Sequence, residues 1–324
     1  MNELLGFFDT LLHAMPGTVT QGMIWGIMAI GVFITYKVLD IADLSVDGTL
    51  CTGGAVCTMM IITGHTMAEA MIVAVLAGML AGLVTAIFHT FMGIPAILAG
   101  ILTQLSLYSI NLKIMGKANQ ALSVRNYDLM VSMNFLRGVE FYRNSIFVVA
   151  VFVVALIAVL YWFFGTEMGC GIRATGSNHN MSRAQGINTR FYTSFGLIIS
   201  NGIVALSGAL LTQYQGFADV QMGRGAIVIG LAAIIIGKAL FGKLLKGNFA
   251  LTLFTVVLGG IVYYIVYQAV ILAGLDSDLL KMLSAIVVAI FLAVPYWKKT
   301  YLTKSNLEWM KAIFSVKKGG ANRA

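Results

Sequence analysis

The sequence predicts an all-α polytopic membrane protein with about nine transmembrane helices. Of its 324 residues, 59% are apolar and only 10% are charged, and the mean hydropathy is +0.89. Soluble domains are about 45–50% apolar and about 25% charged, so a soluble fold of this length could not bury so much apolar surface. The apolar runs are also continuous, whereas the strands of a membrane β-barrel alternate apolar and polar residues.

Nine apolar segments are expected to span the bilayer, each close to the roughly 20 residues that its core requires. Their approximate bounds are 17–36, 38–64, 67–89, 93–115, 144–164, 192–213, 225–241, 248–272 and 279–297. The second span is expected to be interrupted between Asp43 and Gly48, where two acids, a serine and a glycine break the apolar run. Pro95 near the start of the fourth favours a helix start over a short re-entrant element.

The predicted domains are a transmembrane domain at 17–297 and two flanking segments. Residues 1–16 lack the basic start of a cleavable signal and place leucines and Phe8 at helical spacing, which predicts a helix lying in the membrane interface. Residues 298–324 form a basic tail. The net charge of +8 comes from residues at the ends of apolar segments, so it indicates contact with anionic lipid and membrane orientation, not nucleic-acid binding.

Lysine and arginine predict the orientation. The segment 165–191, the turn near 238–246 and the C-terminal tail are basic, and counting spans places all three on one face, which is therefore predicted to be cytoplasmic. With nine spans, the N-terminus is expected outside. The loop 116–143 falls on the outer face although it carries basic residues, because the span at 144–164 separates it from the basic segment 165–191.

A polar segment at 165–190 lies between two long apolar runs and is the main candidate for docking another protein. Ser177 or Asn178 can act as N-cap of a short helix that extends to Gln185, and Gly186 can end it. The alternative is a solvated loop. The candidate coupling residues are Arg173, Ser177, Asn178, His179, Arg183, Gln185 and Gly186.

The interruption in the second span is the candidate translocation path. A carboxylate at the bilayer centre costs about 2.5–3.5 kcal/mol on insertion scales. Such acids therefore line a water-filled cavity or cap a broken helix. The candidate path residues are Asp43, Ser45, Asp47 and Gly48. Alternatively, Asp43 and Asp47 cap a helix that begins near Gly48, a role that is compatible with lining the path.

Three further features have two interpretations each. Asp219 and Arg224 could pair across a turn at an outer mouth, or that turn could be simply solvated. The glycines between 225 and 237 predict close helix packing, either within the chain or between subunits. The tyrosines 263, 264 and 267 could stack on an aromatic ligand or pack in the protein.

No sequence motif indicates an enzyme or a bound cofactor. The chain has no Walker A loop, no HExxH and no GxSxG. Its cysteines, at 51, 57 and 170, form no disulfide framework. Because no span carries the buried acids and lysines of a proton pump, transport is expected to be driven by a partner chain.

Three segments together resemble the permease subunits of bacterial ATP-binding-cassette (ABC) importers, in the group that serves branched-chain amino acids and ribose. The match covers about 17–297 and lies mainly in GIMAIGVFITYKVLDIADLSVDG, GCGIRATGSNHNMSRAQGINTRFY and FADVQMGRGAIVIGLAAIIIGKALFG. The string LSVDG resembles a subgroup linked to tryptophan or tyrosine uptake and departs from the Asn-Phe-Ala-His-Gly of branched-chain members. An aromatic amino acid is therefore the favoured substrate, with a sugar, a nucleoside or a branched-chain amino acid as alternatives.

The resemblance implies an assembly in the bacterial inner membrane. In such an assembly this chain pairs with a second permease copy, most simply as a homodimer, and the translocation path lies between the two. Cytoplasmic ATPases that carry ATP and Mg²⁺ dock on the coupling helices. An outer solute-binding protein delivers the solute. The coupling helix then falls on 177–185 and the path on 43–48. An ion-coupled secondary carrier is the less favoured alternative, with Asp43 and Asp47 as its only candidate ion site.

Overall fold

The computed structural model describes residues 2–123, 127, 129–136, 144–242 and 247–272, with isolated positions between 282 and 293. The chain divides into two units, Met1–Leu275 and Asp276–Ala324. The first unit contains every helix discussed below. The predicted ninth span, apart from isolated positions, and the predicted basic tail lie outside the described residues.

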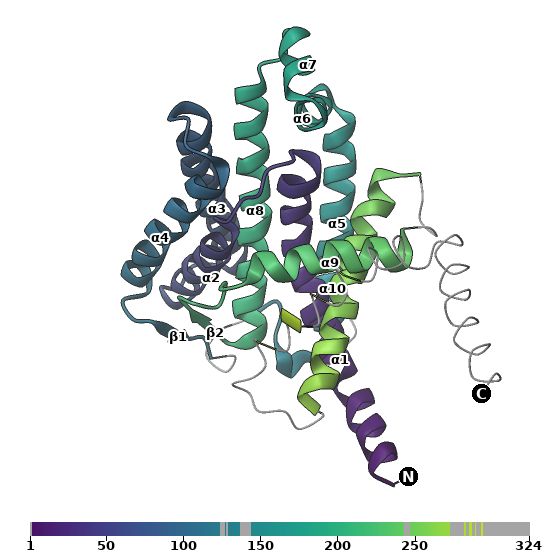
Figure 1. The fold of residues 1–324 in the computed structure, drawn as a ribbon. Coiled ribbons are helices and arrows are strands. Elements are labelled where there is room, and N and C mark those ends of the chain that lie inside the picture. The colour runs from purple at the N-terminus through teal and green to yellow at the C-terminus, as the bar shows by residue number, and fades with distance from the viewer. Residues whose placement is uncertain are drawn as a thin grey trace, which may run out of the picture. The chain divides into compact units, whose positions relative to one another are not determined.

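Ten α-helices and one short β-ribbon make up the described part of the chain (Figure 1). Two π-helical turns, Ile34–Val38 and Ile87–Phe91, extend the first and third helices, and a 3₁₀ turn spans Met133–Leu136. The elements are α1 Asn2–Phe33, α2 Val46–Ile62, α3 Met67–Ala86, α4 Ala96–Met115, β1 Asn119–Ala121, α5 Ser145–Gly165, α6 Glu167–Ser177, α7 His179–Ala184, α8 Thr189–Gln215, β2 Phe217–Asp219, α9 Ala226–Phe241 and α10 Phe249–Leu272.

Six helical segments in the described residues are long and apolar enough to span a membrane. They are Thr10–Val38, Met67–Phe91, Ala96–Met115, Ser145–Gly165, Thr189–Gln215 and Phe249–Leu272. Two shorter apolar helices, Val46–Ile62 and Ala226–Phe241, coincide with the second and seventh predicted spans. The predicted class, an all-α polytopic membrane protein, is confirmed.

The boundaries of some predicted elements differ from the sequence expectation. One helix, α1, runs through Pro16 and covers both the predicted interfacial segment and the first span. The interruption of the second span is a non-helical connector, 39–45, after which α2 begins at Val46. The helix α6 was not expected. Its N-cap residue, Thr166, accepts a 3.5 Å hydrogen bond from the Gly169 amide in the first turn.

The core is built around α8, which packs against α1, α2 and α3 (Figure 1). Its backbone touches that of α2. A Cβ atom on Gly53 would lie 2.1 Å from the Ala205 carbonyl oxygen, and one on Gly208 would lie 2.0 Å from that of Leu50. Small residues of this kind allow membrane helices to approach closely, so they determine how α2 sits against α8.

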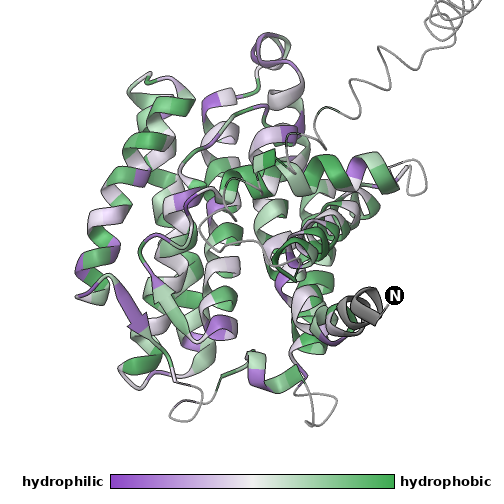
Figure 2. Cartoon of the chain, turned by 60° about the horizontal axis from the view of Figure 1, so that its bottom comes forward, coloured by the Kyte–Doolittle hydropathy of each residue, from purple (hydrophilic) through white to green (hydrophobic). Residues whose placement is uncertain are grey.

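The helices α3, α4 and α5 carry exposed apolar side chains. Figure 2 shows that hydrophobic residues make up much of the helices. Examples of the exposed side chains are Leu80, Leu105 and Val154, which are 62%, 64% and 64% exposed. In water such a surface would be unfavourable, whereas a bilayer solvates it. These helices therefore provide the lipid-facing surface of the described unit.

A two-stranded antiparallel ribbon joins the loop after α4 to the loop after α8. Asn119 lies opposite Asp219, and Ala121 opposite Phe217. The 27 residues of α8 extend over roughly 40 Å at the usual helical rise. This helix therefore separates the ribbon from α7 by about the thickness of a membrane, and Figure 1 shows the two at opposite ends of α8.

Candidate functional site

The connector 39–45 passes between two helices that each provide a glycine. On α4, a Cβ at Gly100 would lie 2.7 Å from the Leu44 amide nitrogen. On α6, a Cβ at Gly176 would lie 1.8 Å from the Val38 carbonyl oxygen. Asp40 adopts a left-handed conformation with φ of 58°, which is uncommon outside glycine. The break in the second span is therefore a tightly held segment.

Asp43 is the centre of a buried polar network. Its Oδ1 accepts hydrogen bonds from the Ser45 amide at 2.9 Å and the Ser45 hydroxyl at 2.6 Å, and its Oδ2 accepts one from Asn201 Nδ2 at 2.8 Å. Thr49 donates to Asn201 Oδ1 at 2.7 Å. Asp43 is only 2% exposed, and no basic side chain of the described residues pairs with it. Neutral donors thus replace water around this carboxylate.

Asp47 contacts a different helix from the one that carries it. Its Oδ2 accepts from the Gly225 amide at 2.9 Å, and its Oδ1 accepts from the Ile227 amide at 3.0 Å. Gly225 is the N-cap residue of α9 and has no side chain with which to cap it. The carboxylate from α2 therefore satisfies the free amides at the N-terminus of α9, where negative charge is also favoured. The expected capping role applies, but the capped helix is α9.

The four candidate path residues thus lie in different surroundings. Asp43, Ser45 and Gly48 are buried within this chain, whereas Asp47 is half-buried. Gly48 packs against α4, where a Cβ on it would lie 3.1 Å from the Gln104 Cα. Sequence reasoning missed Asn201, which is fully buried and links the network to α8. An amide inside an apolar span is the signal that could have identified it.

The polar segment 165–190 forms two consecutive helices. Ser177 ends α6, and Asn178 is the N-cap of α7, accepting a hydrogen bond from the Met181 amide at 2.9 Å. Gly186, with φ of 79°, ends the segment and donates its amide to the Arg183 carbonyl at 3.0 Å. Of the two predicted N-caps, the structure selects Asn178. The helix extends to Ala184, one residue short of the predicted Gln185.

Most of α7 is exposed, since Ser182 is its only buried residue and Met181 is 62% exposed. A pocket of about 220 Å³ lies between α7 and the start of α8. It is lined by His179, Arg183, Gly186, Ile187, Asn188, Thr189 and Arg190. His179 Nε2 lies 3.1 Å from the Thr189 hydroxyl, which connects α7 to the first turn of α8. The helix therefore presents a largely free surface on a well-anchored segment.

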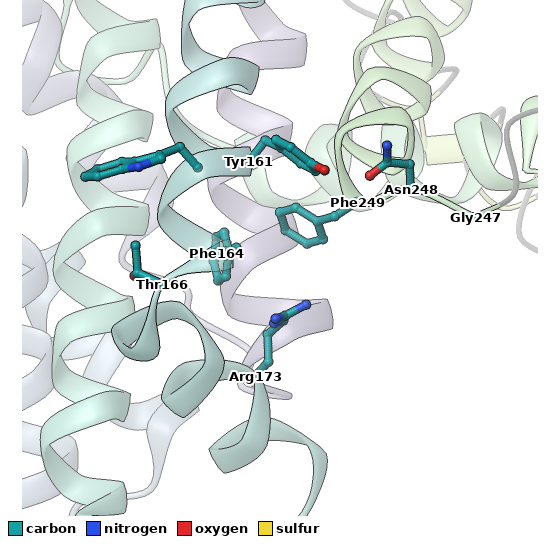
Figure 3. Close-up of a pocket in the computed structure, with 9 residues that line it drawn as sticks. Tyr161, Phe164, Thr166, Arg173, Gly247, Asn248 and Phe249 are labelled. Carbon is teal, nitrogen blue, oxygen red and sulfur yellow. The ribbon is translucent and has the colours of Figure 1, made fainter.

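Arg173 does not line the pocket between α7 and α8. Figure 3 shows its side chain extending from α6 toward Phe249 of α10, at the border of a pocket of about 570 Å³. Its Nη2 lies 3.2 Å from the Cys170 sulfur. Arg173 and Arg183, which were predicted to act together, line different pockets.

The loop after β2 packs onto α2. The Gly223 amide donates to the Cys51 sulfur at 3.1 Å, and a Cβ on Gly223 would lie 2.0 Å from the Asp47 carbonyl oxygen. Asp219 accepts from the Gln221 amide at 2.6 Å and from Asn119 Nδ2 at 3.3 Å. The suggested pair between Asp219 and Arg224 is not formed, because local donors occupy the carboxylate.

The two remaining sequence features are explained by packing within the chain. Tyr263 and Tyr264 are 2% and 6% exposed, their ring centroids lie 5.5 Å apart, and Tyr264 also lies 5.7 Å from Trp25. A Cβ on Gly237 would lie 2.0 Å from the Thr255 carbonyl oxygen, so α9 packs closely on α10. The tyrosines and the glycine face therefore contribute to the core.

The described unit has six helices long and apolar enough to span a membrane and an exposed, capped short helix at one end, an arrangement compatible with a membrane transport subunit. The family model described as branched-chain amino acid transport system / permease component matches residues 15–295, and the chain belongs to this family.

The chain is similar to several curated relatives. The tyrosine transport system permease protein of Clostridioides difficile (strain R20291) is 40% identical over 283 residues, covering 87% of this chain and 91% of the relative. An uncharacterized protein of Rickettsia prowazekii (strain Madrid E) is 32% identical over 283 residues, covering 87% and 98%. The D-allose transport system permease protein AlsC of Escherichia coli (strain K12) is 28% identical over 273 residues, covering 79% and 78%.

Family membership confirms the resemblance seen in the sequence. The protein is a multi-pass membrane protein and the permease component of an ABC importer. It is a transport subunit that carries no cofactor and catalyses no reaction, and the ATPase is a separate chain.

Proposed function

We propose that this permease imports an aromatic amino acid, with tyrosine favoured over tryptophan. The observation that supports this most strongly is the 40% identity, over 87% of the chain, to a permease named for tyrosine transport. The LSVDG string at the start of α2 supports the same subgroup. A sugar is the second candidate, because the D-allose permease is also a relative, but its identity of 28% is lower.

Reconstitution tests the substrate. The chain is placed in proteoliposomes with its cognate ATPase and solute-binding protein, and uptake of labelled tyrosine is compared with that of tryptophan, leucine and allose. We expect ATP-dependent accumulation of tyrosine that excess tryptophan inhibits and excess leucine does not. Uptake of allose or leucine in place of tyrosine would contradict the assignment. Uptake driven by an ion gradient, without the ATPase, would instead favour a secondary carrier.

We propose that the end of the molecule that carries α7 faces the cytoplasm, with the N-terminus outside. Lys37, Arg173 and Lys238 line neighbouring pockets at one end, which is the distribution that the positive-inside rule associates with the cytoplasmic face of an inner-membrane protein. In this orientation the loop 116–143 and the β-ribbon face the binding protein. The outer-mouth residues Asp219 and Arg224 belong to that face.

The three cysteines allow a direct test of orientation. Cys170 is exposed on α6, whereas Cys51 and Cys57 are buried. We expect a membrane-impermeant maleimide to leave intact cells unlabelled and to label Cys170 after permeabilisation, and Cys170→Ser to remove this signal. Labelling of Cys170 in intact cells would place α6 and α7 outside.

We propose that the cytoplasmic ATPase docks on α7 and the adjoining end of α6. The proposed docking residues are Ser177, Asn178, His179, Arg183, Gln185 and Gly186. Arg173, which the sequence had placed in the same set, lines the pockets next to α10 and is not part of the proposed contact surface. The caps at both ends of α7 favour a rigid element that can transmit a displacement. Only four residues separate α7 from α8, so movement of α7 would act on α8 directly.

The path is proposed to run beside residues 43–48 in a pair of permease copies, most simply a homodimer. Asn201 on α8 holds Asp43, and Asp47 holds the N-terminus of α9. These two contacts form a continuous mechanical connection from α7 through α8 and the connector to α9. Asp47, the partly exposed member of the four candidates, is the residue we place closest to the solute.

A further inference from the structure

Three neighbouring pockets share lining residues, and together they are called the trough here. A pocket of about 570 Å³ shares Arg173 and Phe249 with one of about 480 Å³, and the latter shares Phe33 and Lys37 with a third of about 280 Å³. The trough lies where three membrane-spanning segments begin or end, at Val38, Gly165 and Phe249. This position is the level of the lipid head groups.

The polar lining of the trough is mainly basic. Lys37, Arg173 and Lys238 all line it, and all three are exposed. None of the three forms an ion pair within the described residues. Asp40 is the only acidic residue among the described lining residues. Three cations facing one acid leave a net positive charge, which suits an anionic ligand.

The rest of the lining is aromatic. The Phe249 ring lies 4.8 Å from Phe164 and 6.2 Å from Phe33, which are themselves buried. Tyr161 and Trp162 on the spanning helix α5 also line the largest of the three pockets, and they are 49% and 72% exposed. Figure 3 shows Tyr161 on the side of α5 that faces Phe249. Exposed Tyr and Trp at the end of a span are typical of the membrane interface. The trough therefore combines cations with an apolar surface that continues toward the bilayer.

We propose that this trough binds the phosphate head group of an anionic phospholipid, with Lys37, Arg173 and Lys238 facing the phosphate and the aromatic side chains contacting the acyl chains. The alternative, an acidic surface of the ATPase, fits less well, since Arg173 extends from α6 toward α10 and not toward the exposed surface of α7 (Figure 3). A lipid in this position would bridge α1, α6, α9 and α10 next to the docking helix, so head-group binding could influence coupling.

Native mass spectrometry of the full chain in detergent tests the proposal. Phosphatidylglycerol is titrated against phosphatidylcholine for the natural chain, for the double variant Lys37→Gln with Lys238→Gln, and for Arg173→Gln. The matched control is Lys113→Gln with Lys117→Gln, which removes the same charge from exposed lysines at the other end of α4 and in the following loop. Because each basic residue near an anionic lipid contributes about 1 kcal/mol, we expect phosphatidylglycerol binding to weaken about fivefold in Arg173→Gln and about 30-fold in the double variant, with no change in the control.

The outcomes distinguish a phospholipid head group from free inorganic phosphate as the ligand of the trough. Retention of phosphatidylglycerol over phosphatidylcholine in the presence of millimolar inorganic phosphate supports a lipid site. Displacement of the lipid by inorganic phosphate, equal binding of the two lipids, or equal loss in the trough and control variants overturns it. If the trough variants bound lipid normally but no longer assembled with the ATPase, the lipid site would also be overturned. The trough would then be a docking surface for the ATPase. Circular dichroism and size-exclusion profiles confirm that each variant is folded.

Discussion

The side-chain amide of Asn201 on α8 donates a 2.8 Å hydrogen bond to the carboxylate of Asp43, although the two residues are 158 positions apart. This contact anchors the connector 39–45 to the central helix. Asn201→Ala leaves a carboxylate oxygen buried without that donor, and an unsatisfied buried group costs about 1–3 kcal/mol, more when it is charged. We expect a lower midpoint of thermal unfolding in detergent.

Asn119→Ala is the matched control for this prediction. Its amide contacts Asp219 at 3.3 Å on the exposed ribbon, where water can replace it. Equal unfolding midpoints for the two variants would show that the Asp43–Asn201 contact contributes little to stability.

Asp47 is expected to determine the stability of the start of α9. Asp47→Ala removes the acceptor of the Gly225 and Ile227 amides, and loss of a helix cap costs about 0.5–2 kcal/mol. Asp47→Asn keeps one acceptor oxygen and should have a smaller effect. Hydrogen exchange measured by mass spectrometry should show faster exchange in the peptide containing 225–229 for Asp47→Ala. Unchanged exchange there would contradict the capping role.

The close approach of α2 and α8 predicts sensitivity to a single methyl group. Gly208→Ala would place its Cβ 2.0 Å from the Leu50 carbonyl oxygen, and overpacking of this kind costs about 1–3 kcal/mol. We expect a lower yield of folded protein and a lower unfolding midpoint. Gly165→Ala is the control, because a Cβ there meets nothing within 4 Å. Similar behaviour of the two variants would argue against direct backbone contact between these helices.

Reversing charge on α7 should separate ATP hydrolysis from transport. Because Arg183 is exposed, Arg183→Glu should leave the unfolding midpoint unchanged. It should reduce ATP-driven uptake by on the order of 100-fold, because like charges that face each other at an interface cost several kcal/mol. Arg173→Glu should have a smaller effect, since its side chain lies toward α10. Lys113→Glu, in the last turn of α4, is the control. Normal uptake by Arg183→Glu would exclude it from docking.

The predictions from sequence were most accurate where the signal was local. Apolar run length predicted the spans, and Asn178 and Gly186 bounded the short helix because capping depends on residues within one turn. The helix α6 was missed because three glycines in EMGCGIRATGS lower its intrinsic helical preference, and tertiary contacts compensate for this. One of them, Gly176, permits the close contact with Val38.

The candidate path shows the limit of such reasoning. The pattern of Asp43 and Asp47 indicated either a path or a helix cap, because both uses place a carboxylate in a broken span. Ser45, two positions away, donates to Asp43, but Asn201 and Gly225 lie more than 150 positions from the carboxylates that they contact. An amide in an apolar span can draw attention to Asn201, but the single sequence does not pair it with Asp43. The same holds for Lys37, Arg173 and Lys238, which lie on different helices.

The sequence by itself determined the membrane class, the approximate spans and the polar segment at 165–190, because these follow from composition and hydrophobic run length. Its resemblance to the importer permeases indicated the partner ATPase. Only the tertiary structure decided that Asp43 is buried by Asn201, that Asp47 caps α9, and that Arg173 and Arg183 occupy separate pockets. The physical reason is that hydropathy and capping are properties of neighbouring residues, whereas the partner of a buried charge is selected by how distant helices pack.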